Sequence, residues 1–128
     1  MSKAVFDSSA ILALYYNEPG RKKVLQHLNR HEPLISAINL SEVFTKLSED
    51  GLTEDEMLES FDGLDIRIID FNKQQSIVAA RLRPGTKHLG LSLGDRACLA
   101  LAMVETAIAV TADRAWTKVR NVKVETIR

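Results

Sequence analysis

One stretch decides the fold: residues 92–105 read Ser-Leu-Gly-Asp-Arg-Ala-Cys-Leu-Ala-Leu-Ala-Met-Val-Glu. Ser92 and Asp95 have the spacing of a capping box, in which two side chains bond the backbone of the first helical turn. From Ala97 to Val104 every residue is apolar, and a helix that is hydrophobic all round belongs in the interior. The stretch therefore predicts a buried helix with a carboxylate at its amino end. Burial of that charge is costly unless it is hydrogen-bonded, paired or metal-bound.

Short apolar strands and helices alternate on either side of this helix. Strands are predicted at 3–6, 34–37, 66–71, 108–111 and 122–127, and helices at 8–16, from 21 onward, from an N-cap at Asn39, at 53–61, 73–82, 93–105 and 115–119. In the helix at 53–61 we expect Leu58 to face the core, and 83–90 reads as a polar loop. The alternation predicts an α/β fold with a central, mostly parallel sheet flanked by helices. Residues 1–128 fit a single domain.

Composition narrows the class of protein. No apolar run approaches the roughly 20 residues of a membrane-spanning helix, and no secretory signal is visible, so we expect a cytoplasmic protein with no membrane partner. Seventeen basic residues balance 17 acidic ones, which excludes nucleic-acid binding through overall positive charge and leaves only local contacts. Cys98 has no Cys or His at a zinc-ligand spacing and is interpreted as a packing residue.

Four acids, Asp7, Glu42, Asp95 and Asp113, each fall where a strand ends or a helix begins. Each one alone could be a helix cap, and Asn39 with Glu42 reads as a variant capping box. In an open α/β sheet, however, the ligand crevice lies outside the carboxyl ends of the strands, so such acids can meet in space. Oxygen ligands suit Mg²⁺ and Mn²⁺. A divalent-metal site and ordinary capping are both open interpretations at this point.

Four segments that contain these acids resemble the motifs of one family. They are residues 6–10 (Phe-Asp-Ser-Ser-Ala, with Glu-Pro-Gly at 18–20), 39–43 (Asn-Leu-Ser-Glu-Val), 91–101 and 110–116 (Val-Thr-Ala-Asp-Arg-Ala-Trp). In order and spacing they resemble PIN-domain ribonucleases, specifically the VapC-type toxins of type II toxin-antitoxin systems. The resemblance spans nearly the whole chain and implies a PIN-like three-layer sandwich forming one nuclease domain.

The resemblance also implies a chemistry. It makes Asp7, Glu42, Asp95 and Asp113 the catalytic and metal-binding acids of an endoribonuclease that hydrolyses RNA phosphodiester bonds, with Ser9 and Thr111 as supporting hydroxyls. The implied cofactor is Mg²⁺ or Mn²⁺. Some relatives carry a further acid after the fourth motif where this chain has Ala and Trp, at 115 and 116, so one or two ions are both compatible. The implied partners are an RNA substrate, a VapB-like antitoxin that presents a basic side chain to the acids, and a second copy in a homodimer.

Two other functions compete with this interpretation. A small-molecule phosphatase could use Asp7 as nucleophile, but haloacid-dehalogenase-like enzymes usually place a second Asp two residues later, where this chain has Ser9. A non-catalytic interaction module could use the same acids to bind a basic partner. Arg83, Lys87 and His88, just before the buried helix, could contact phosphate or could simply be solvated.

Overall fold

A five-stranded sheet forms the centre of the protein in the computed structural model, which describes residues 1–128. The strands are β1 (Lys3–Phe6), β2 (Glu32–Ser36), β3 (Arg67–Ile69), β4 (Ile108–Thr111) and β5 (Val124–Thr126), in the order β3-β2-β1-β4-β5. All four neighbouring pairs are parallel. The predicted parallel sheet is confirmed.

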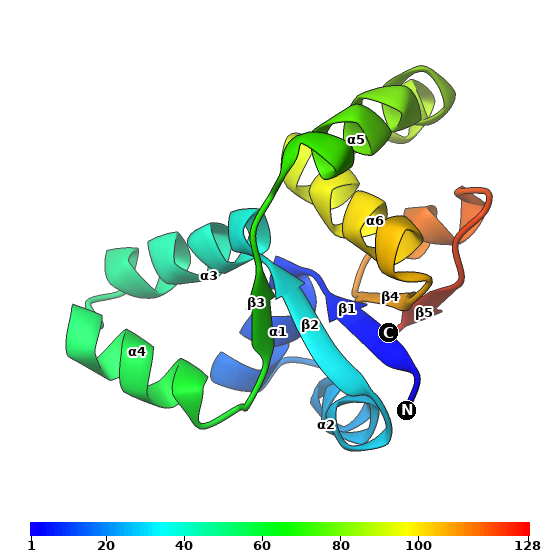
Figure 1. Cartoon of the computed structure of the whole chain (residues 1–128). Helices are drawn as coiled ribbons and strands as arrows, with labels where there is room; N and C mark the ends of the chain where they lie inside the picture. Colours follow the sequence, from blue (N-terminus) through cyan, green and yellow to red (C-terminus); the bar gives the residue numbers. More distant parts are fainter.

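Helices cover both faces of this sheet (Figure 1). The helices are α1 (Ser8–Tyr15), α2 (Arg21–Arg30), α3 (Ala37–Glu49), α4 (Glu54–Asp62), α5 (Lys73–Thr86) and α6 (Leu93–Glu105), with 3-10 turns η1 (Lys87–Leu89) and η2 (Arg114–Lys118). The chain moves from β1 outward to β3, then crosses back to β4 and β5. Because parallel crossovers are right-handed, this reversal places α1 to α4 on one face and α5, α6 and η2 on the other. The result is a three-layer sandwich.

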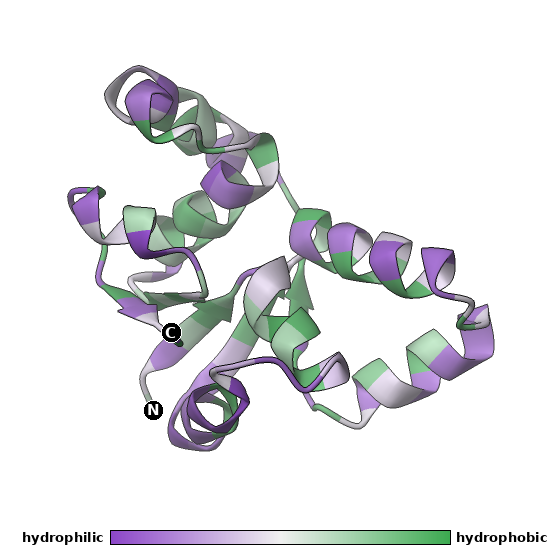
Figure 2. Ribbon diagram, turned by 180° about the vertical axis from the view of Figure 1, so that it is seen from behind, coloured by the Kyte–Doolittle hydropathy of each residue, from purple (hydrophilic) through white to green (hydrophobic).

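Two apolar cores lie on either side of the sheet, and strand alternation separates them. In β1, Ala4 and Phe6 pack into the core beneath α1 to α4, whereas Val5 packs into the core formed with α6 and Trp116. Side chains of a strand point alternately to its two faces, so one strand serves both cores. Figure 2 shows hydrophobic strands at the centre and a largely hydrophilic α2 at the surface.

Helix α6 has the predicted character. All its residues from Ala97 to Ala102 are buried, and both hydrogen bonds of the Ser92–Asp95 capping box are present. Thr106 ends the helix in the left-handed conformation, with φ of 51°. The carboxylate of Asp95 therefore stands where this buried helix begins.

The start of α3 differs from the prediction. Ser36, the last residue of β2, is the N-cap, and its hydroxyl accepts a hydrogen bond from the backbone N–H of Ile38 at 3.2 Å. The helix begins at Ala37, so Asn39 lies inside it and the capping box with Glu42 does not form. Both Ser and Asn favour the N-cap position, and the earlier residue is used because the strand runs directly into the helix.

Helix α5 is longer than predicted. It continues through Pro84 to Thr86, although proline usually ends a helix because it lacks an N–H and crowds the preceding turn. The Thr86 hydroxyl donates to the carbonyl of Leu82 at 2.6 Å, which satisfies an acceptor in this last turn. The predicted polar loop at 83–90 is thus mostly helical.

Smaller differences concern the sheet edges and α4. The outermost strands β3 and β5 are shorter than predicted, as each has a neighbour on one side only. Leu58 was expected to be inward but is 45% exposed, because the short α4 packs mainly on α3 through residues such as Phe61. No helix has the length and apolar character needed to cross a bilayer.

Candidate active site

The strand order creates a switch point between β1 and β4. These neighbours are paired in parallel, with Phe6 opposite Val110, and the segments that follow them lie on opposite faces of the sheet. A crevice outside the strand ends is expected at such a point. Asp7 comes directly after β1, and its backbone N–H donates to the carbonyl of Val110 at 3.1 Å. Asp113 comes two residues after the end of β4.

Asp7 is the buried acid of this edge, with only 4% of its surface exposed. Its Oδ1 accepts hydrogen bonds from the Ser9 hydroxyl at 2.7 Å and the Ala10 backbone N–H at 2.9 Å. Its Oδ2 accepts one from the Thr111 hydroxyl at 2.7 Å. Ser9 in turn accepts from the backbone N–H of Ala112 at 3.0 Å. Asp7 caps α1, and the same carboxylate is fixed against the end of β4.

Burial changes the acidity of Asp7. Removal from water disfavours the charged form and raises the pKa of Asp7 from 3.8 to about 6, against the opposing hydrogen bonds from Thr111, Ala10 and Ser9. The negative charge of Asp95 adds to the increase. A cation beside Asp7 would favour its charged form.

Asp95 is half-buried at the first turn of α6. Its Oδ2 accepts from the Ser92 backbone N–H at 2.8 Å, while its own N–H donates to the Ser92 hydroxyl at 3.2 Å. The capping interpretation is therefore correct for Asp95. The cap uses only the Oδ2 atom of Asp95, so Oδ1 has no partner within the chain and is available for a ligand.

Glu42 is exposed, and Asn39 holds its carboxylate in place. The Asn39 amide donates both to Glu42 Oε1 at 2.9 Å and to the carbonyl of Gly94 at 3.0 Å, linking α3 to α6. Gly94 is needed for this approach, because a Cβ atom at that position would lie 2.4 Å from Glu42 Oε2. The sequence did not predict that Asn39 holds the Glu42 carboxylate or that position 94 requires a glycine. The three-residue separation of Asn39 and Glu42, which places them on one helix face, was the available signal.

The buried thiol of Cys98 is affected by the charges of three of these acids. Burial raises its pKa well above the ordinary value, and the charges of Asp7, Asp95 and Glu42 raise it further. Of these acids, Asp95 lies in the first turn of α6 and the Glu42 carboxylate lies against Gly94 in the same turn. Asp113 is exposed and stands apart: its Oδ1 accepts from the Ala115 N–H at 2.9 Å as the cap of η2. It is connected to Asp7 through Thr111, whose hydroxyl oxygen accepts the Asp113 N–H at 3.0 Å.

The edge of the sheet that carries Asp7, Glu42, Asp95 and Asp113 is called the acidic edge. Its chemistry suits a hard divalent cation. All four acids offer oxygen donors, which Mg²⁺ and Mn²⁺ prefer, and none of the five ion pairs in the chain involves any of them. The side chains are not drawn together into a finished ligand set, since no group of three or more Asp, Glu, His or Cys is positioned to hold an ion. Asp7, Asp95 and Asp113 are fixed as helix caps and Glu42 is held by Asn39, and each carboxylate keeps an oxygen lone pair that could bind a ligand.

Three arginines, Arg83, Arg96 and Arg114, donate hydrogen bonds to backbone carbonyls. Arg83 donates to Leu91 at 3.3 Å and Arg96 to Ala79 at 3.0 Å. Arg114, the residue after Asp113, donates to the carbonyl of Arg128 at 2.9 Å. The acids therefore have no arginine partner in the free chain.

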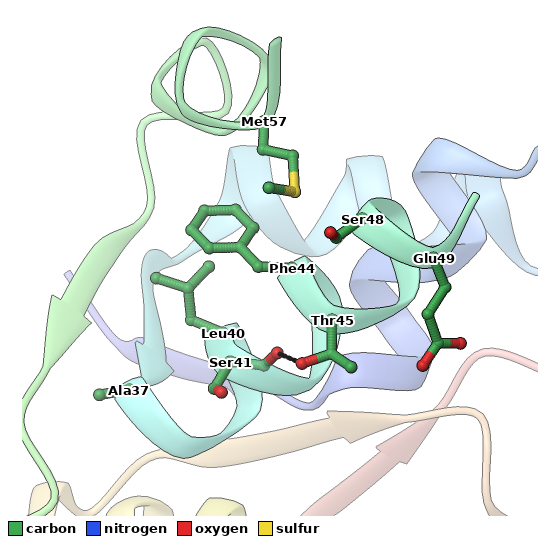
Figure 3. Close-up of a pocket in the computed structure, with 8 residues that line it drawn as sticks. All are labelled: Ala37, Leu40, Ser41, Phe44, Thr45, Ser48, Glu49 and Met57. Carbon is green, nitrogen blue, oxygen red and sulfur yellow. Dashed lines mark hydrogen bonds between the residues drawn. The ribbon is translucent and has the colours of Figure 1, made fainter. Parts of the chain in front are cut away.

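A separate shallow groove lies between α3 and α4 (Figure 3). It has a volume of about 590 Å³ and its apolar lining includes Leu40, Phe44 and Met57. Ser41, which precedes Glu42, lies at one end, but none of the four acids lines it. This groove is adjacent to the acidic edge without being part of it.

The fold and its acidic edge define a class: a parallel α/β protein with carboxylates gathered at the switch point. The chain belongs to the PIN domain family, whose model matches residues 4–122. PIN domains are generally nucleases, that is, hydrolases. No functionally curated protein is significantly similar to the chain in sequence.

Several solved structures with the same fold are VapBC or toxin-antitoxin complexes. DNA-bound VapBC from Salmonella typhimurium is 19% identical, with full coverage of both chains and a TM-score of 0.75. A toxin-antitoxin complex from Klebsiella pneumoniae is 22% identical over 98% of each chain, also with a TM-score of 0.75. DNA-bound VapBC2 from Rickettsia felis is 21% identical over 97% of this chain and 98% of that one, with a TM-score of 0.72. At these identities the similarity establishes the fold.

Proposed function

We propose that this protein is a divalent-metal-dependent endoribonuclease that acts as the toxin of a toxin-antitoxin pair. The observation that carries the proposal is the environment of Asp7. This buried carboxylate accepts three hydrogen bonds at the switch point of a PIN fold, beside Asp95 and with no cationic side chain as partner. A carboxylate buried in this way without a counter-ion is costly, and a bound cation would offset that cost.

The proposed cation ligands are Asp7, Glu42, Asp95 and Asp113, binding one or two Mg²⁺ or Mn²⁺ ions. When bound, such an ion lowers the pKa of water and stabilises negative charge on phosphate oxygens during in-line displacement. The protein's contribution is to fix the carboxylates. Ser9 and Thr111 orient Asp7 by hydrogen bonding.

Glu42 is proposed to act on the attacking water. Asn39 occupies its Oε1, so Oε2 is the oxygen that accepts the proton as the water oxygen bonds to phosphorus. The ester P–O bond breaks in the same displacement, and the leaving oxygen takes a proton from solvent. General bases must lie within hydrogen-bonding reach of the proton they remove. The bond from Asn39 and the close approach to Gly94 keep Glu42 turned toward the start of α6.

The proposed partners follow from the same edge. Exposed, unpaired carboxylates favour a VapB-like antitoxin that covers them with a basic side chain. Structural neighbours of this fold are VapBC toxin-antitoxin complexes, which supports an antitoxin partner. A homodimer and a cytoplasmic location are proposed on the same family grounds.

The test is to map new RNA 5′ ends after brief induction of wild type and of Asp95→Asn. Asparagine keeps an oxygen that can accept the Ser92 N–H, so the cap survives while the ligand charge is lost. We expect discrete 5′ ends with wild type only, together with growth arrest. Equal end maps at equal soluble expression would contradict the nuclease proposal and favour the non-catalytic binding module.

The chain supplies a matched control. Helix α4 begins with an equivalent capping box, in which Glu56 Oε1 accepts from the Thr53 N–H at 2.9 Å, on a helix whose capping box includes none of the proposed ligands. Glu56→Gln changes the same kind of cap by the same charge. RNA cleavage should persist in Glu56→Gln, so loss of cleavage in both variants would indicate a stability effect.

A further inference from the structure

A second concave surface, which we call the basic groove, lies between the end of α5, the last turn of α6 and the segment after η2. Its volume is about 680 Å³, and its polar lining includes Arg81, His88, Lys118, Arg120 and Asn121. In Figure 1, α5 lies above α6, and η2, drawn in orange, lies on the side of α6 away from α3. The groove shares no residue with the four acids or with the groove between α3 and α4.

Positive charge in the basic groove is not neutralised within the chain. No Asp or Glu lines it. Arg81, Lys118 and Arg120 form none of the five ion pairs and none of the side-chain hydrogen bonds of the structure, and all three are exposed. The chain has a formal net charge of zero, so this concentration of cations is local. Like charges gathered in a concave surface raise the local concentration of anions.

Helix α6 connects the basic groove with the acidic edge. Asp95 is in its first turn, and Met103, in its last turn, lines the groove. These residues are eight positions apart, which corresponds to about 12 Å along the axis at about 1.5 Å per residue. A polymer with a phosphate in every unit can reach both sites at once, whereas a single phosphate cannot.

We propose that the basic groove binds the phosphodiester backbone of the RNA substrate at nucleotides remote from the cleaved bond. This inference rests on the proposed ribonuclease function and adds a second substrate contact to it. Guanidinium and ammonium groups donate to phosphate oxygens without reading sequence. No aromatic side chain lines the groove, so it lacks a platform for stacking bases. The groove therefore strengthens binding of longer RNA regardless of its sequence.

The test measures binding separately from cleavage. A fluorescein-labelled uridine homopolymer is titrated with protein in EDTA, at several salt concentrations, by fluorescence anisotropy. The groove variant is Arg81→Gln/Lys118→Gln/Arg120→Gln. The control variant, Lys22→Gln/Lys23→Gln/Arg30→Gln, removes the same charge from exposed positions of α2 that form no ion pair.

We expect the groove variant to bind about tenfold more weakly at low salt and the control to bind like wild type. For single strands, each lost phosphate contact reduces the slope of log K against log salt by about 0.7, so three contacts give about 2. Equal losses in both variants, or wild-type binding by the groove variant, would overturn the proposal. A groove variant that loses binding to polyglutamate while keeping RNA affinity would also overturn it, in favour of an acidic protein partner.

Parallel cleavage assays in Mg²⁺ separate this proposal from the proposed function. Suppose that wild type cleaves RNA and that the groove variant has the wild-type KM for both long and short RNA. The groove proposal then fails and the nuclease proposal stands. If RNA binding depends on the groove but the wild-type protein never cleaves RNA, the nuclease proposal fails and the groove is an RNA-binding site without cleavage. If the triple variant does not fold, single Lys118→Gln and Arg120→Gln variants should each lower the salt slope by about 0.7.

Discussion

Replacing Asp7 by Asn should make the metal-free protein more stable at neutral pH while abolishing its activity. The native carboxyl group has a pKa raised from 3.8 to about 6, so the folded state at pH above this value contains an unfavourable charge. At about 1.4 kcal/mol per pH unit, the shift corresponds to about 3 kcal/mol. An amide in place of the carboxylate removes that penalty.

Part of this gain is lost through hydrogen bonding. Asn can still accept the bonds from Ser9 and Ala10 through its oxygen, but its NH₂ group meets the Thr111 hydroxyl, which donates to Asp7 Oδ2 in wild type. That hydroxyl oxygen already accepts the Asp113 N–H, so one hydrogen bond worth about 1 kcal/mol is disturbed. The expected net stabilisation is about 2 kcal/mol.

The pH dependence has a definite sign. Because the folded state binds the Asp7 proton more tightly than the unfolded state, this group stabilises the fold most below about pH 4. Its contribution falls as pH rises from about 4 to about 6 and is constant above that range. The stability difference between Asp7→Asn and wild type should therefore appear across this window. Below about pH 4 the variant should have no advantage.

Urea denaturation in EDTA, followed by the fluorescence of the buried Trp116, measures this difference. Asp62→Asn is the control, because Asp62 is exposed and forms no ion pair. Mg²⁺ or Mn²⁺ should then stabilise wild type but not Asp7→Asn, since a ligand of the folded state alone adds to its stability. An Asp7→Asn variant that is less stable than wild type at neutral pH, or a difference that does not change with pH, would refute the reasoning.

Three further perturbations test residues in and around the proposed site. Thr111→Val removes a donor to the Asp7 carboxylate. We expect carboxyl NMR titration to show an Asp7 pKa above its wild-type value, and denaturation to show a loss of about 1–3 kcal/mol in unfolding free energy. RNA cleavage should also be weaker. Gly94→Ala should displace the flexible Glu42 carboxylate and reduce cleavage while leaving the melting temperature unchanged or higher, because Ala favours a helix over Gly; a fully active variant would contradict the role of Glu42. Iodoacetamide should alkylate the buried Cys98, whose pKa is raised, only as fast as the protein unfolds, and mass spectrometry showing rapid alkylation in native buffer would contradict this.

Much of the fold could be predicted because its signals are local. The apolar run in α6, its capping box and the alternation of strands and helices depend on residues close in sequence, and the structure reproduces them. Local signals gave the wrong residue at the start of α3 and at the end of α5. Ser36 rather than Asn39 caps α3, and α5 continues through Pro84 to Thr86 although proline usually ends a helix.

The sequence by itself determined the fold class and which acids stand at strand and helix ends, because propensity, periodicity and capping act over a few residues. Only the tertiary structure decided what those acids contact. Pairing of β1 with β4 brings Thr111 to Asp7 across 104 positions, and Asn39 crosses from α3 to Gly94 on α6 across 55. The basic groove likewise combines the end of α5 with the segment after η2. Such contacts depend on strand order and crossover direction, which bring distant residues together through packing rather than through local sequence.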